Sequence, residues 1–224
     1  MLFTLIELFD IILMIFAAGF IFSKLMARPI PRINDDEPYD PLKQYKKKRS
    51  SFDWHNFWIC CIVAGSALVL HEMGHKFAAM YFGMNATISA PYTWLLLAVV
   101  LVLIGSPLIF FVGGVTSFSC SQIAPSAYCV LQSVTANGIT STFWMPTNSS
   151  LAIIAFAGPF VNLVLWLGSW LLMSNKIFAK KNKKYLPILQ LTKQINMILF
   201  IFNMLPIPGF DGWGVFSNLY YILF

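Results

Sequence analysis

The amino-acid sequence predicts an all-α polytopic membrane protein: a bundle of about four to six transmembrane helices, with a possible re-entrant or β-hairpin segment near 113–147. Of its 224 residues, 58% are hydrophobic and 11% are charged, whereas a soluble domain carries about 25% charged residues. The mean hydropathy is +0.72. Apolar runs long enough to cross a bilayer recur along the chain, and no polar block is long enough to form a soluble catalytic domain.

The chain divides into three regions. Residues 1–23 are predicted to form an N-terminal transmembrane helix, because the run over 2–23 is too long for a signal-peptide core and lacks a basic start. Residues 24–56 form a polar linker that contains the basic run KKKR. Residues 57–224 hold the remaining apolar segments and are predicted to be the functional core.

Three apolar runs of this core predict spanning helices, over 57–83, 149–174 and 186–204. A last apolar stretch runs to Phe224. Gly83 is suited to end the first of these helices, because glycine is the usual residue after a helix C-terminus.

Two segments between these helices are less regular. The run over 93–112 is interrupted by Gly105, Ser106 and Pro107, and the sequence leaves open whether it crosses the membrane or only dips into it. The uncharged segment 113–147 alternates small, hydroxyl and β-branched residues, which favours strands or a re-entrant hairpin. Its two cysteines, Cys120 and Cys129, can pair if their loop is extracytoplasmic, and this also stays open.

Acidic residues are nearly absent from the predicted core. Of the nine in the chain, only Glu72 and Asp211 follow Asp53. Glu7 and Asp10 lie near the start of the first apolar run, where we expect a membrane interface. An ionisable residue within a membrane segment is costly and typically functional. Glu72 and Asp211 are therefore the first candidates for a functional site.

The stretch HEMGH at 71–75 has the spacing of a metal site. His71 and His75 are four positions apart, so a helix places both imidazoles on one face. Glu72 projects about 100° around the helix and can reach a water at the metal without binding the metal. This is the H-E-x-x-H pattern of zinc peptidases, in which the metal lowers the pKa of the water to about 7 and the glutamate passes its proton to the leaving amine. The alternative is a polar helix–helix contact made by neutral histidines.

A catalytic zinc ion takes three protein ligands and a water, so a third ligand is required. The other histidine and the cysteines are His55, Cys60, Cys61, Cys120 and Cys129. At 1.5 Å per residue of a continuous helix, the first three lie about 15–24 Å from His71 and are excluded.

The third ligand is therefore Cys120, Cys129 or Asp211. Pro206 and Pro208 must open the helix just before Asp211, which suits an inward-pointing carboxylate. We predict Asp211 as the ligand, and the alternative is that it only caps the last helix.

Three motifs in this order resemble the site-2 protease family of intramembrane zinc metalloproteases. HEMGH is similar to the family's HExxH, AGPFVNLVL at 157–165 to its G-P-x-x-N helix, and NMLPIPGFDG at 203–212 to its N-x-x-P-x-P-x-x-D-G element. A weaker match is GGVTS at 113–117, which resembles the glycine-containing segment between the first two motifs. The resemblance covers roughly residues 57–215.

The resemblance implies one Zn²⁺ per chain, held by His71, His75 and Asp211, with Glu72 as the catalytic base. It also implies hydrolysis of peptide bonds in or beside the transmembrane segment of a membrane-protein substrate. The chain departs from the family in two respects: it has no PDZ-like domain, and it carries the apolar insertion at 93–112. The family's usual helix count and substrate route therefore do not transfer directly.

Further residues are expected to bind substrate: Asn162, Asn203, Pro206, Pro208, Gly113 and Gly114. The Asn162 carboxamide is suited to donate to the scissile carbonyl, with an interhelical hydrogen bond as the alternative. Asn203 is suited to brace the Pro-x-Pro loop. An unwound substrate needs a backbone partner, which the Pro206–Gly209 backbone or the 113–147 segment can supply by strand addition.

The net charge of +6 comes from two basic loops, eight Lys and Arg within 24–56 and five within 175–185. Such loops mark cytoplasmic ends of spans, so we expect a multi-pass protein of the cell membrane, with the lipid bilayer and a transmembrane protein substrate as partners and no nucleic acid. HEMGH and Asp211 then share the half of the membrane away from the basic loops. This orientation is opposite to the one usual in the resembled family, and the sequence leaves it open.

Two other functions compete with the intramembrane peptidase. A catalytically inactive zinc-binding membrane scaffold, or pseudo-protease, would keep the metal but not turn over, and the intact Glu72 argues against it. An ion transporter built on broken helices would need acidic residues along a path, and only two acids follow Asp53.

Overall fold

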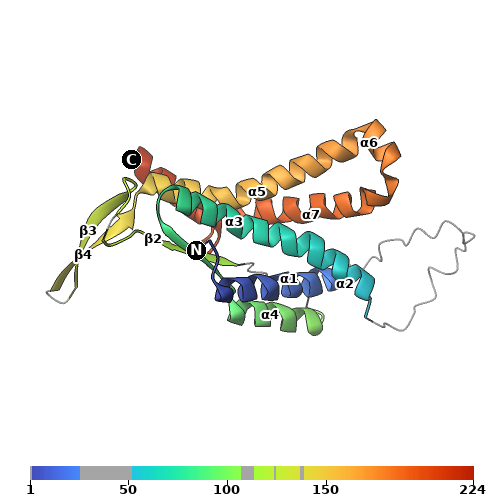
Figure 1. Ribbon diagram of the computed structural model, residues 1–224, viewed down its shortest axis with the longest axis horizontal. Coiled ribbons are helices and arrows are strands. Elements are labelled where there is room, and N and C mark those ends of the chain that lie inside the picture. The colour runs from blue at the N-terminus through green and yellow to red at the C-terminus, as the bar shows by residue number, and fades with distance from the viewer. Residues whose placement is uncertain (1, 26–51, 107–113, 124, 137–138) are drawn as a thin grey trace, which may run out of the picture.

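The computed structural model describes residues 2–25, 52–106, 114–123, 125–136 and 139–224. Within them, four helices are long and apolar enough to cross a membrane. They are α1 (Leu5–Leu25), the continuous helix Trp54–Tyr81, α5 (Asn148–Ser174) and the helix Lys183–Asn203, which ends in α7 (Leu186–Asn203). The predicted helical membrane bundle with added β-structure is therefore confirmed, and its long helices run side by side (Figure 1).

The helix Trp54–Tyr81 consists of α2 (Trp54–Cys60), a π-helical turn (Cys61–Gly65) and α3 (Ser66–Tyr81). Asp53 caps its start by accepting hydrogen bonds from the backbone of His55 and Asn56. Most of the predicted 24–56 linker, residues 26–51, lies outside the described residues.

Small residues bring α1 close to this second helix. A Cβ on Gly19 of α1 would lie 2.1 Å from the sulfur of Cys61, and one on Gly65 would lie 2.8 Å from the side chain of Ile15. Helices in a membrane associate through such close packing, because lipid tails leave little hydrophobic driving force between them. The tight fit puts α1 directly against the helix that carries HEMGH.

The second half of the core is a helical hairpin. Figure 1 shows α5 and α7 side by side, joined at the far end of the molecule by α6 (Lys176–Lys181) and a short 3-10 turn (Lys183–Tyr185). The last helix, α8 (Asp211–Leu223), packs against α5 near the opposite end.

The chain forms two antiparallel two-stranded sheets. Strand β1 (Asn85–Ser89) pairs with β2 (Val115–Ser119), and β3 (Cys129–Ala136) pairs with β4 (Ile139–Pro146). The strands expected within 113–147 are therefore present, and the β3–β4 hairpin projects from the end that also holds both termini (Figure 1).

The two questions that the sequence left open in this region have different outcomes. Cys120 and Cys129 form a disulfide, which ties the end of β2 to the start of β3. In the segment 93–112, the described part is helix α4 (Tyr92–Leu103), and its 12 residues span about 18 Å, too little to cross a bilayer core of about 30 Å. Residues 107–112 lie outside the described residues.

Gly83 ends α3, as predicted from the sequence. It adopts a φ of 73°, a left-handed conformation that glycine adopts without steric cost. The chain then turns directly into β1, which places the β1–β2 sheet beside the C-terminal half of α3.

Candidate metal centre

The HEMGH stretch lies within α3, with its polar side chains turned into the protein. His71, Glu72 and His75 are all buried. The Nε2 atoms of the two imidazoles lie 3.1 Å apart, as expected for side chains one helical turn apart. Two unprotonated nitrogens at this distance repel each other unless a proton or a cation lies between them.

Asp211 reaches this position because the backbone between α7 and α8 turns sharply. The Phe210 amide donates to the Ile207 carbonyl at 3.1 Å, closing a turn with Pro208 at its second position. Gly209 follows with a φ of 98°, and this pattern is a type II turn. Asp211 is then the first residue of α8, but the structure has no side-chain cap at this helix start. Its carboxylate turns to the histidines instead, so the capping alternative does not describe it.

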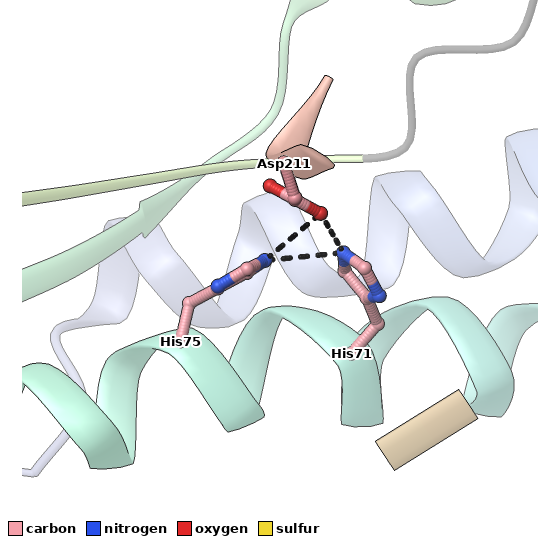
Figure 2. Close-up of side chains that lie close together, drawn as sticks. All are labelled: His71, His75 and Asp211. Atoms are coloured by element: carbon pink, nitrogen blue, oxygen red, sulfur yellow. Dashed lines mark hydrogen bonds and ion pairs between the residues drawn. The ribbon is translucent and has the colours of Figure 1, made fainter. Parts of the chain in front are cut away.

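The three predicted ligand side chains converge on one point (Figure 2). Oδ2 of Asp211 lies 3.0 Å from Nε2 of His71 and 3.4 Å from Nε2 of His75. Atoms that bind one tetrahedral zinc at 2.0–2.2 Å lie about 3.3–3.6 Å from one another. The three separations are close to this range, so a bound ion would need only a small outward shift of the side chains. Among the described residues this is the group of His, Cys, Asp and Glu that could hold a metal.

Both imidazoles are oriented from behind by α5. Nδ1 of His75 lies 2.7 Å from the carbonyl oxygen of Ile154, to which it donates when Nε2 binds a metal. Nδ1 of His71 lies 2.9 Å from the carboxamide nitrogen of Asn162, whose oxygen has no hydrogen-bond partner among the described residues. Rotating the Asn162 carboxamide by 180° exchanges its nitrogen and oxygen. Its oxygen then accepts a hydrogen bond from the N–H at Nδ1 of His71. This donor arrangement fits a zinc ion bound through both Nε2 atoms.

Two glycines leave room for the site. A Cβ on Gly158 of α5 would lie 2.2 Å from Nε2 of His75 and 2.8 Å from Nε2 of His71. A Cβ on Gly114 would lie 2.7 Å from the carboxyl carbon of Glu72. Any side chain at either position would displace a histidine of the site or Glu72, which gives a physical reason for glycine in both motifs.

The ligands and Glu72 line one cavity of about 410 Å³, between α3, the β1–β2 sheet, α5 and the start of α8. Among the residues expected to bind substrate, Asn203 and Gly114 also line it. Pro206 and Pro208 are exposed on the surface, in the loop whose Gly209 and Phe210 form part of the cavity wall.

Besides the two prolines, two more of the predicted substrate residues are not among those that line the cavity. Asn162 is fully buried behind His71, and its predicted contact with substrate stays a prediction. Gly113 lies outside the described residues. Cys120 and Cys129, which the sequence left as possible ligands, are occupied by their disulfide.

Three features around the site were not predicted from the sequence. The Thr116 hydroxyl donates to the Glu72 carboxylate at 2.8 Å. Lys76, directly after HEMGH, is 1% exposed and forms an ion pair with Glu7 of α1. Asp10 accepts hydrogen bonds from the hydroxyl of Tyr92 and the backbone of Ala90. The sequence signal for the last two features was the presence of two acids, Glu7 and Asp10, in an otherwise apolar N-terminal helix.

Comparison with known proteins places the chain in a protein family. The family model for peptidase family M50 matches residues 59–181. A proposed zinc metalloprotease of Methanocaldococcus jannaschii is 30% identical over 156 residues, which cover 70% of this chain and 68% of that protein. No solved structure matches. The chain therefore belongs to peptidase family M50, the family of the site-2 proteases that its motifs resemble.

This membership defines the chain as a zinc metalloprotease of a membrane-protein family. The family match ends at residue 181, before Asp211. The assignment of Asp211 therefore depends on the distances at the site, which are independent of that match.

Proposed function

We propose that this protein is an intramembrane zinc endopeptidase of a cell membrane, and that it hydrolyses peptide bonds in or near transmembrane segments of other membrane proteins. One zinc ion per chain would be held by His71, His75 and Asp211. When bound, zinc supplies a Lewis acid that polarises the attacking water and the scissile carbonyl.

The observation that carries this proposal is the convergence of three metal ligands and a carboxylate on one cavity between apolar helices. Two of the ligands lie within the helix Trp54–Tyr81, which is long enough to span a membrane. An active site supported by such a helix favours a substrate that is itself in the membrane.

Glu72 has the position of a general base. It is adjacent to His71 and lines the same cavity, yet it is absent from the group of three converging ligand atoms. Its carboxylate would accept a proton from the attacking water and deliver it to the nitrogen of the departing amine, which completes hydrolysis of the peptide bond.

A transmembrane substrate must unwind before cleavage, because a helix hides its peptide groups in internal hydrogen bonds. Strand β2 supports a way to hold the unwound segment. Val115, Thr116 and Phe118 of β2 line the cavity, and β1 occupies the other edge of β2. A substrate strand would add to the edge of β2 that faces the cavity.

The direct test uses purified protein in lipid vesicles with a single-span membrane protein whose transmembrane segment contains helix-destabilising residues. Mass spectrometry of the products should find a cut in or beside that segment. The Glu72→Gln variant should keep its zinc and lose cleavage by at least about 100-fold.

The same experiment distinguishes the peptidase from the alternative function, a zinc-binding scaffold without activity. A pseudo-protease scaffold would contain zinc in wild type and in Glu72→Gln, but it would cleave none of a panel of such substrates. Cleavage of soluble unfolded proteins alone would contradict the intramembrane specificity while leaving the peptidase chemistry in place.

A further inference from the structure

The side chain of Glu72 is held by Thr116, a residue of the GGVTS segment for which the sequence predicts no role of its own. Oγ1 of Thr116 lies 2.8 Å from Oε2 of Glu72 and 3.2 Å from its backbone carbonyl. The hydroxyl has one proton, and the shorter, charge-assisted contact to the carboxylate is the stronger acceptor for it. One oxygen of the Glu72 carboxylate is therefore fixed by β2, which leaves the other for the attacking water.

We infer that Thr116 is a positioning residue for the catalytic base of the proposed peptidase. A glutamate side chain on a helix has several rotatable bonds, and only a small part of its range would bring a carboxylate oxygen beside the attacking water. Gly114 acts with Thr116, because only a residue without a Cβ lets the strand approach the Glu72 carboxyl group this closely.

The position of Thr116 is in turn fixed to α3 through α1. Thr116 pairs in register with Ile88 of β1. The backbone N–H of Ile88 donates to Oε1 of Glu7 at 2.9 Å, and the same oxygen accepts from Nζ of Lys76. Lys76 follows His75 on α3, so one buried carboxylate joins the sheet to the helix that carries both the ligands and Glu72.

This arrangement explains why two acids lie in an apolar N-terminal helix. Glu7 is 4% exposed and Asp10 2% exposed, and both accept backbone hydrogen bonds from the segment Ile88–Ala90. α1 therefore fixes where the β1–β2 sheet lies along α3. The hydrogen bond from Thr116 of this sheet then fixes the carboxylate of Glu72.

The inference rests on the proposed peptidase activity, and Thr116→Val tests it, because valine keeps the shape of threonine and removes the hydroxyl. We expect kcat to fall at least about tenfold with KM and zinc content unchanged. Thr116→Ser, which keeps the hydroxyl, should restore most of the lost rate. Thr87→Val is the matched control, since Thr87 lies on the neighbouring strand in register with Ser117 and should tolerate the change.

A second readout does not depend on turnover. Infrared difference spectra between each protein and its Glu72→Gln counterpart isolate the carboxylate stretch of Glu72. That band should shift in Thr116→Val and stay in place in Thr116→Ser and Thr87→Val. This measurement distinguishes a failure of the inference from a failure of the proposed function, because it applies even if no substrate is cleaved.

Three results would overturn the inference. An unchanged carboxylate band and kcat in Thr116→Val would mean that the hydroxyl does not act on Glu72. A raised KM with unchanged kcat would assign Thr116 to substrate binding. Loss of zinc in Thr116→Val, with no rescue by serine, would assign it to the general stability of the site.

Discussion

The carboxylate of Asp211 lies 3.0 Å from Nε2 of His71, although 140 positions separate the two residues in the sequence. One is within a long membrane-type helix, and the other is at the first residue of a short terminal helix. The β-turn before Asp211 and the close packing of Gly212 on the backbone of Met204 bring them together. The fold thus brings two buried histidines and one half-buried carboxylate together at one place, where a shared cation would compensate them.

The three ligands should act as a unit in metal binding. We expect wild-type protein to contain about one zinc per chain, and His71→Ala, His75→Ala and Asp211→Ala to contain little, because a tetrahedral site with an open position needs all three. Metal analysis of purified protein measures this directly. His55→Ala, at the start of the same long helix, is the control and should keep its zinc. Unchanged zinc in Asp211→Ala would remove that residue from the site.

Gly158→Ala should weaken zinc binding by about 10- to 100-fold, because the added methyl group must displace the imidazoles. Competition with a chelator of known affinity measures the loss. Gly168→Ala is a matched control on the same helix, since a Cβ there meets nothing within 4 Å. The interpretation of Gly158 is wrong if the two variants bind zinc equally well.

The ion pair between Glu7 and Lys76 should matter most when only one partner is removed. Each of Glu7→Gln and Lys76→Met leaves a buried charge without its counter-ion, so we expect each to lose about 3–5 kcal/mol of unfolding free energy. The double variant has neither charge of this pair, and its glutamine oxygen can still accept from Ile88. It should be more stable than either single variant in thermal unfolding in detergent, whereas simple additivity of the two losses would contradict the pairing.

Reduction of the Cys120–Cys129 disulfide should loosen the β3–β4 hairpin without releasing zinc. The bond ties the hairpin to β2, and neither cysteine is a ligand. Loss of such a cross-link typically costs about 2–4 kcal/mol. We expect the Cys120→Ala/Cys129→Ala variant to be cut faster by an added protease within 125–146, with zinc content equal to wild type. A fall in zinc content would show that the hairpin supports the metal site.

The sequence by itself determined the helical membrane class and the long helices, and it singled out the three residues that the structure brings together. Each of these depends on a local signal: the length of an apolar run, the four-residue spacing of His71 and His75, and the prolines before Asp211. Such signals survive without knowledge of the fold, because the periodicity of a helix and the conformational limits of proline act within a few residues.

Only the tertiary structure decided how these parts are held. Three contacts at the site join residues that are far apart in the sequence. Asn162 contacts His71, Gly158 leaves space for the two imidazoles, and the Thr116 hydroxyl donates to Glu72. The pairing of Cys120 with Cys129 and the burial of Glu7 against Lys76 are of the same kind. Hydrogen bonds and close packing act over a few ångströms, so no spacing in one dimension reveals which distant side chains come within that range.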